Sequence, residues 1–98
     1  MKKFSRHRTL DELKSLCAER GLKLNTDRYD HAGSDYVLVS GLFAGEAAEV
    51  LCSTFNGRFF GALADGRKFT EDDAHDGQPW FDAILDLVYV FAPEAAHG

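Results

Sequence analysis

The sequence predicts an α+β domain, a two-layer sandwich with two helices on one face of an antiparallel sheet of four or five strands. Helical patterns lie near both ends of the chain, and strand-like alternation with turn signals fills the stretch between them. A chain of 98 residues with 45% hydrophobic and 28% charged residues is typical of one soluble domain with one core. We expect a single domain over residues 1–98, with a basic arm at 1–8 and a frayed tail at 93–98.

The first helix is expected from Thr9 to Arg20. Thr9 and Glu12 have the spacing of a capping box, in which each residue bonds the other's backbone N–H. Gly21 suits the position just after a helix, because glycine tolerates left-handed backbone angles. The apolar positions at helical spacing are Leu10, Leu13, Leu16 and Cys17. This narrow stripe predicts a helix that packs on a sheet through one face.

A hairpin is expected next. The stretch from Leu22 to Tyr29 alternates apolar and polar side chains, and Tyr36 to Ser40 is rich in β-branched residues. The turn between the two strands falls at His31 to Ser34. The glycines of Gly41 to Ala48 predict a bend or bulge, with a short helical turn as the alternative. The leucine and phenylalanine there either cover the edge of the core or form a contact site.

A three-stranded meander is predicted from Glu49 to Thr70. Asn-Gly at 56–57 and Asp-Gly at 65–66 are typical of two-residue hairpin turns. Pairing residue 55 with 58, and 64 with 67, sorts the side chains into two faces. The predicted core face holds Leu51, Ser53, Phe55, Phe60, Ala62 and Phe69. The opposite face, which meets water or a partner, holds Val50, Cys52, Thr54, Phe59, Leu63, Lys68 and Thr70.

An acidic linker from Glu71 to Gln78 separates the meander from the last helix. Its acids resemble a calcium loop, but Ala74 and Ala83 stand where ligands are required, so we expect no metal. Pro79 suits the first position of a helix. The apolar stripe of this helix comprises Trp80, Ala83, Ile84, Leu87, Val88 and Phe91. A strand over the Val-Tyr-Val at 88–90 is the less favoured alternative to a helix that continues through it.

Charge is divided unevenly along the chain. Residues 1–34 hold eight Lys or Arg and five Asp or Glu, a formal charge of +3. Residues 35–98 hold three Lys or Arg and eleven Asp or Glu, a formal charge of −8. An acidic half attracts basic partners and disfavours direct contact with phosphates. Simple solubility is the alternative reading of this acidity.

The chain shows no motif of catalysis or cofactor binding. Cys17 and Cys52 have no CxxC spacing, and we expect buried free thiols. A catalytic pair of Cys52 with His75 is the less favoured reading. Four scattered histidines and the turn glycines match neither a zinc site nor a phosphate loop. We expect no enzyme and no cofactor. The start lacks the apolar run of a signal peptide and no stretch is long enough to span a bilayer, which favours the cytoplasm.

These observations favour a small acidic protein that binds and inhibits a protein with a basic, nucleic-acid-handling surface. Small proteins of phages and other mobile elements, including inhibitors of nucleases and CRISPR effectors, often act in this way. An acidic surface can occupy a groove that normally holds a phosphate backbone, with aromatic side chains as anchors. The predicted contact residues are Phe59, Tyr36, Asp65, Glu71, Asp72, Asp73 and Asp76, with Trp80 as a further anchor where exposed.

Two alternatives remain open. A homodimer formed by the last helix and the Phe59 face is one. A sheet surface that stacks single-stranded nucleic acid on Phe59 and Phe60 beside Arg58 is the other. The acidity of residues 35–98 argues against the second alternative.

Overall fold

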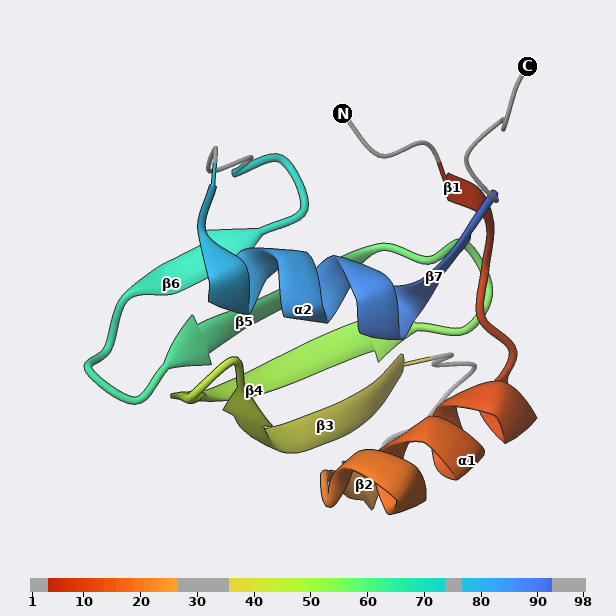
Figure 1. Cartoon of the computed structure of the whole chain (residues 1–98), viewed down its shortest axis with the longest axis horizontal. Helices are drawn as coiled ribbons and strands as arrows, with labels where there is room; N and C mark the ends of the chain where they lie inside the picture. Colours follow the sequence, from red (N-terminus) through yellow and green to blue (C-terminus); the bar gives the residue numbers. More distant parts are fainter. Residues whose placement is uncertain (1–3, 27–35, 74–76, 93–98) are drawn as a thin grey trace.

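The structure is a computed structural model that describes residues 4–26, 36–73 and 77–92. The elements in chain order are β1 (Phe4–His7), α1 (Leu10–Arg20), β2 (Lys23–Asn25), β3 (Tyr36–Phe43), β4 (Glu46–Ser53), β5 (Phe59–Leu63), β6 (Lys68–Thr70), α2 (Pro79–Val88) and β7 (Tyr89–Phe91). Figure 1 shows their arrangement.

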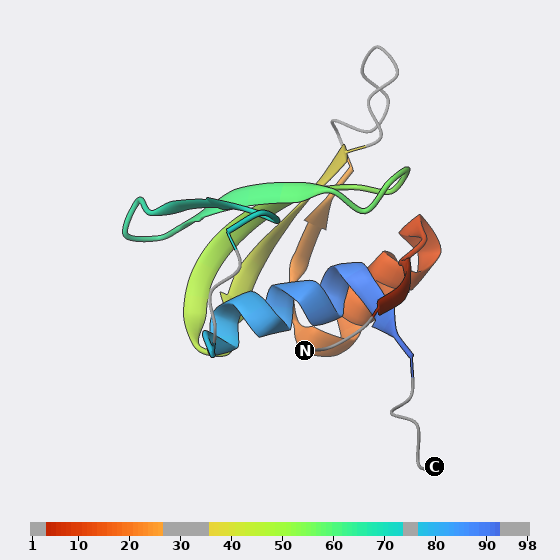
Figure 2. The same ribbon diagram turned by 90° about the horizontal axis from the view of Figure 1, so that it is seen from above.

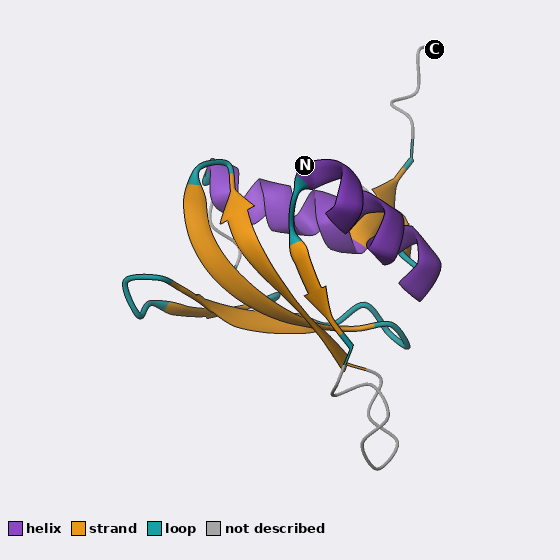
Figure 3. Cartoon of the chain, turned by 90° about the horizontal axis from the view of Figure 1, so that it is seen from below, coloured by secondary structure: helices purple, strands orange, loops and turns teal. Residues whose placement is uncertain are grey.

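Five of the strands form an antiparallel meander in the order β2-β3-β4-β5-β6, and β1 pairs with β7 in a separate two-stranded sheet. Both helices lie on the same face of the meander, and β3 and β4 curve around α2 (Figures 2 and 3). The predicted α+β sandwich is therefore confirmed. The two-stranded sheet is an addition that the sequence did not predict.

α1 forms as its sequence predicts. The backbone N–H of Glu12 donates to Oγ1 of Thr9, and the backbone N–H of Thr9 donates to the carboxylate of Glu12. Gly21 ends the helix with a φ of 71°, which a glycine adopts without strain. Leu13 and Cys17 are buried against the sheet.

The first hairpin is shorter than expected on its β2 side, where only Lys23–Asn25 is strand within the described residues. The predicted turn at 31–34 lies outside those residues. β3 is longer than expected, because it runs through the predicted bend to Phe43. Phe43 pairs with Glu46, so Ala44 and Gly45 form a two-residue turn. Both have positive φ, 51° and 87°, as a type I′ turn requires.

The turn containing Asn56 and Gly57 is two residues longer than predicted. Cys52 pairs with Phe59, and the N–H of Ser53 donates to the carbonyl of Arg58, so residues 54–57 form a four-residue loop. A change of two residues leaves every side chain on the same side as its predicted neighbours.

The next turn is one residue longer than predicted. The N–H of Leu63 donates to the carbonyl of Arg67, so residues 64–66 form a three-residue loop with Gly66 at a φ of 94°. Phe69 therefore pairs with Gly61 rather than Ala62. A shift of one residue moves Phe69 to the opposite face of the sheet.

The face that we predicted as core is the exposed one, and this prediction is wrong. Phe59 is only 1% exposed, whereas Phe60 is 46% and Phe55 is 74% exposed. The apolar stripe of α2 covers the Phe59 side of the sheet. This side is therefore the core face, and the predicted core face is exposed. The sheet residues of the core are Val37, Val39, Phe43, Ala48, Val50, Cys52, Phe59, Leu63 and Phe69.

α2 begins at Pro79 and its apolar stripe is buried, as expected. Trp80 packs with its ring 5.2 Å from that of Phe69. The Val-Tyr-Val segment leaves the helix at Tyr89 and continues as β7, which is the strand alternative. Phe59 and the apolar residues of α2, which the homodimer alternative would place in an interface, are buried within one molecule. No helix in the described ranges is long and apolar enough to cross a membrane.

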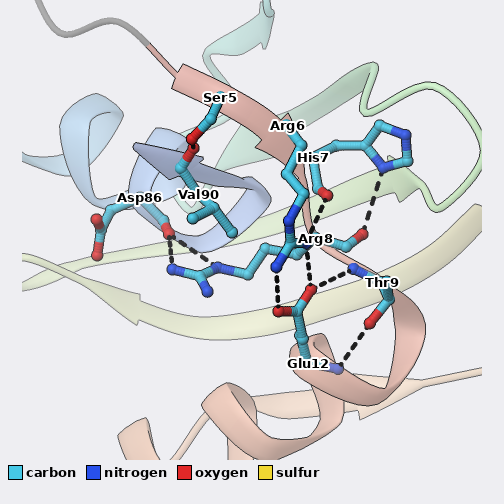
Figure 4. A network of polar contacts seen from close by, with 8 residues as sticks. All are labelled: Ser5, Arg6, His7, Arg8, Thr9, Glu12, Asp86 and Val90. Carbon is cyan, nitrogen blue, oxygen red and sulfur yellow. Dashed lines mark hydrogen bonds and ion pairs between the residues drawn. The ribbon is translucent and has the colours of Figure 1, made fainter. Parts of the chain in front are cut away.

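The predicted basic arm is a strand in its described part, residues 4–7. Ser5 Oγ donates to the carbonyl of Val90 over 2.9 Å, and Arg8 donates to the carbonyl of Asp86 (Figure 4). Arg6 forms a bidentate pair with Glu12, with both N···O distances 2.7 Å. This hydrogen-bonded ion pair lowers the pKa of Glu12 to about 2. β1 is thus fastened to both helices rather than free.

Candidate functional site

The meander has one face without helices, which we call the open face. Side chains alternate along each strand, so the partners of the buried residues share this second surface. Its described side chains are Lys23 and Asn25 on β2, Tyr36, Leu38, Ser40 and Leu42 on β3, Ala47, Glu49 and Leu51 on β4, Phe60 and Ala62 on β5, and Lys68 and Thr70 on β6. No described helix covers it (Figure 3).

The centre of the open face is apolar. Leu38 pairs with Leu51, and Leu51 pairs with Phe60, so the three side chains cross three strands in one row. We call this row the apolar ladder. The ring of Tyr36 lies 5.8 Å from that of Phe60 and extends the ladder at one side. A shallow groove of about 520 Å³ is lined by the ladder together with Glu49, Ala62 and Lys68.

Two charged side chains project from the row next to the ladder. Glu49 on β4 and Lys68 on β6 each pair with Ala62, which lies between them. Within the described part of the chain, neither makes an ion pair or a side-chain hydrogen bond. Each described arginine, in contrast, is bonded within the molecule. Glu49 and Lys68 are therefore available to a partner.

Carboxylates lie at both ends of β6, the last strand of the sheet. We call Asp65, Glu71, Asp72 and Asp73 the acidic edge. Asp65 accepts the backbone N–H of Arg67 at 3.0 Å, and its other oxygen lies 2.7 Å from the guanidinium of Arg67. The backbone hydrogen bond, with help from the guanidinium, lowers the pKa of Asp65. This carboxylate stays charged at neutral pH.

The other three carboxylates follow β6. Arg58 Nε lies 3.0 Å from Glu71, and Arg58 Nη2 lies 3.9 Å from Asp72, which is a looser contact. Asp73 accepts the backbone N–H of Thr70 at 2.8 Å, which fixes the end of the strand. Two arginines thus neutralise part of the acidic edge. The side chain of Asp72 remains 82% exposed.

The structure places some of the predicted contact residues at the surface and others in the core. Phe59 is buried in the core, and Trp80 is also buried, so neither reaches a partner surface in this conformation. Tyr36 is half-buried on the open face. The four residues of the acidic edge gather around β6, and Asp76 lies outside the described residues.

Sequence reasoning missed the apolar ladder. Apart from the nucleic-acid alternative, the sequence predicts Phe60 in the core, and it does not single out Leu38. The usable signal was the sequence of β3, in which Val37 and Val39 alternate with Tyr36 and Leu38. A strand that is apolar on both faces either lies between two layers or exposes one apolar face to a partner.

The cysteines and the metal-ligating side chains were the candidate groups for chemistry in the sequence. Cys17 and Cys52 are buried free thiols, as expected, and burial raises the pKa of Cys52 to about 12. A thiol in that state is a poor nucleophile at neutral pH. His75, its suggested partner, lies outside the described residues. Within the described ranges, no three His, Cys, Asp or Glu side chains are placed to hold a metal ion.

Of the three residues of the nucleic-acid alternative, Phe59 is buried, Phe60 is exposed, and Arg58 is exposed and paired with Glu71. Comparison of the chain with protein-family models, curated proteins and solved structures finds no match.

Proposed function

We propose that this protein is a non-enzymatic binding protein whose acidic edge contacts a basic, nucleic-acid-handling protein and blocks its phosphate-binding surface. The observation that carries the proposal is the placement of four carboxylates around one exposed edge strand, with two arginines as their ion-pair partners among the described residues. The surplus of carboxylates attracts a cationic surface over long range.

The internal hydrogen bonds of the acidic edge support this role. Asp65 and Asp73 are each held by a backbone N–H, and Glu71 is held by Arg58. Carboxylates already fixed in place lose less side-chain entropy when a partner binds.

The experiment removes charge from the edge without removing its hydrogen-bond acceptors. In the edge variant, Glu71→Gln is combined with Asp72→Asn and Asp73→Asn. In wild type, the backbone N–H of Thr70 donates to the carboxylate of Asp73 over 2.8 Å. The amide oxygen of the Asp73→Asn side chain can still accept this hydrogen bond. The stability of the fold should therefore change little.

A matched control removes three charges elsewhere. Asp11→Asn, Glu19→Gln and Asp82→Asn alter exposed helix residues that form no ion pair within the described part of the chain. Both variants change the net charge by the same amount. A difference between them therefore reports the location of the charge and not its total.

Wild type, edge variant and control are immobilised, and bacterial lysate is passed over each at low and moderate salt. We expect wild type and control to retain a nucleic-acid-handling protein that salt releases, and the edge variant to lose it. Equal retention by the edge variant, or the absence of any protein that distinguishes it from the control, would refute the proposal. Thermal melts of all three must agree for the comparison to stand.

A further inference from the structure

The open face combines an apolar centre with two charges, Glu49 and Lys68, that form no ion pair within the described residues. The apolar ladder of Leu38, Leu51 and Phe60 lies in one straight row across β3, β4 and β5. Glu49 and Lys68 lie in the adjacent row and have no ion pair within the described residues. An exposed apolar patch with a charged border is typical of a protein interface.

We propose that a second copy of this chain packs on the open face, about a two-fold axis that runs along the apolar ladder. This inference goes beyond the proposed function, which uses the edge of β6 and not the face of the sheet. An axis in this position lies across the strands and between the two sheets. Each ladder residue then meets the same residue of the second copy. Apolar side chains therefore face apolar side chains along the whole row.

The charges on the open face select this axis over its neighbour. An axis one row away, along Glu49 and Lys68, would place Glu49 against Glu49 and Lys68 against Lys68 of the second copy. Opposed like charges destabilise an interface. The ladder axis avoids this, because it moves each residue of the Glu49 row to the other side of the ladder.

The same axis gives Lys68 an oppositely charged partner. Thr70 pairs with Phe60 and marks the position of the ladder row on β6. Lys68 lies two residues before Thr70. Asp72 follows the end of β6 in a turn, and its contact with Arg58, two residues before Phe60, places it on the other side of the ladder row. Rotation about the row therefore brings Lys68 toward Asp72 of the second copy, and the reverse pair forms at the same time. Asp72 is well exposed and only loosely held by Arg58, so it is free to make this contact.

The size of the face predicts a weak dimer. Eight-residue strands rise about 3.3 Å per residue and five strands lie about 4.8 Å apart, so the face measures roughly 26 by 24 Å. β2 and β6 are short, and β3 and β4 curve away at their shared hairpin (Figure 2). About 400 Å² per copy remains, or roughly 800 Å² in total, which falls in the weak and transient class of interfaces.

Sedimentation velocity of the full chain, from about 5 to about 500 μM, measures this equilibrium. We expect wild type to shift from monomer to dimer over this range, and Phe60→Ser to raise the dissociation constant at least about tenfold. Leu42→Ser is the matched control. Leu42 is an even more exposed side chain of the open face, at 66% against 46% for Phe60, but it lies at the curved hairpin end of β3 and outside the contact.

A charge exchange tests the position of the axis. Lys68→Asp and Asp72→Lys should each weaken the dimer, because each places like charges opposite one another. An equimolar mixture of the two variants should dimerise again, because every pair is then of opposite sign. General destabilisation cannot produce that recovery.

Three results would overturn the proposal: a wild type that stays monomeric at 500 μM, equal effects of the Phe60 and Leu42 variants, or a mixture that does not recover. Asp72 belongs to both surfaces, but the two sets of measurements distinguish the proposals. If the protein stays monomeric but still retains its partner through the acidic edge, only the dimer proposal is refuted. If it dimerises but retains no partner through the acidic edge, only the proposed function is refuted.

Discussion

Phe59 and Phe60 are consecutive residues of β5 that point to opposite faces, so their alanine variants show which face is the core. Phe59 is enclosed by the helix layer, and its ring lies 5.9 Å from that of Phe81. Removing a buried phenylalanine costs about 3–5 kcal/mol, because transfer energy is lost and a cavity remains. Phe60 already exposes about half of its side chain and encloses no cavity, so its loss costs about 1 kcal/mol.

Each kcal/mol moves the melting temperature of a domain of this size by about 4–8 °C. We expect Phe59→Ala to lower it by at least about 12 °C, and Phe60→Ala by less than about 8 °C. Urea unfolding followed by circular dichroism at about 5 μM, below the range of the proposed dimer, gives both free energies. If Phe59→Ala does not fold, Phe59→Leu should still cost about 1–2 kcal/mol. Equal losses at the two positions, or a larger loss at Phe60, would refute the assignment of the faces.

Three further predictions follow from individual contacts. Gly61→Ala should destabilise the fold by more than about 2 kcal/mol in urea unfolding, because the new Cβ would meet the backbone carbonyl of Glu49; a neutral result would contradict the close approach of β4 and β5. The pKa of Glu12 is lowered from 4.5 to about 2, so its charged form stabilises the fold above pH 4.5 and this contribution disappears as the pH falls through 2. Wild type should thus lose its advantage over Glu12→Gln between these pH values, and parallel stability curves would argue against the ion pair. Cys17 and Cys52 should resist a thiol reagent in the native protein and react once it is unfolded, whereas rapid native labelling would show that the core opens.

Local signals in the sequence were sufficient for the helices and for the order of the strands. The capping box of Thr9 and Glu12 and the stop at Gly21 involve neighbouring residues, so their chemistry can be read directly from the chain. Pro79 marks the start of α2 for the same reason.

The register of the sheet could not be predicted from turn dipeptides alone. Asn-Gly and Asp-Gly occur in loops of two, three or four residues, because each loop needs a positive φ at only one or two positions. The loop before β6 has one residue more than predicted, so Phe69 lies on the opposite face of the sheet from the predicted one. The buried face of the sheet is the one on which α2 packs, and α2 and the strands are far apart in the sequence. Turn signals between neighbouring residues do not determine such a contact.

The candidate site was predicted in part. The acidic edge follows from composition, since Glu71, Asp72 and Asp73 are consecutive. Their pairing with Arg58, and the apolar ladder on the open face, depend on the strand register and so became visible only in three dimensions.

The pairing of β1 with β7 has a consequence for how the chain folds during synthesis. The hydrogen bond from Ser5 to Val90 joins residues 85 positions apart, and every other element lies between them. Closing so long a loop has a high entropic cost, and contacts distant in sequence tend to form late. On the ribosome, β1 must wait without a partner until β7 has been translated, while α1 and the meander assemble. The stacking of Phe4 on Tyr89 then completes the fold as one of its final steps.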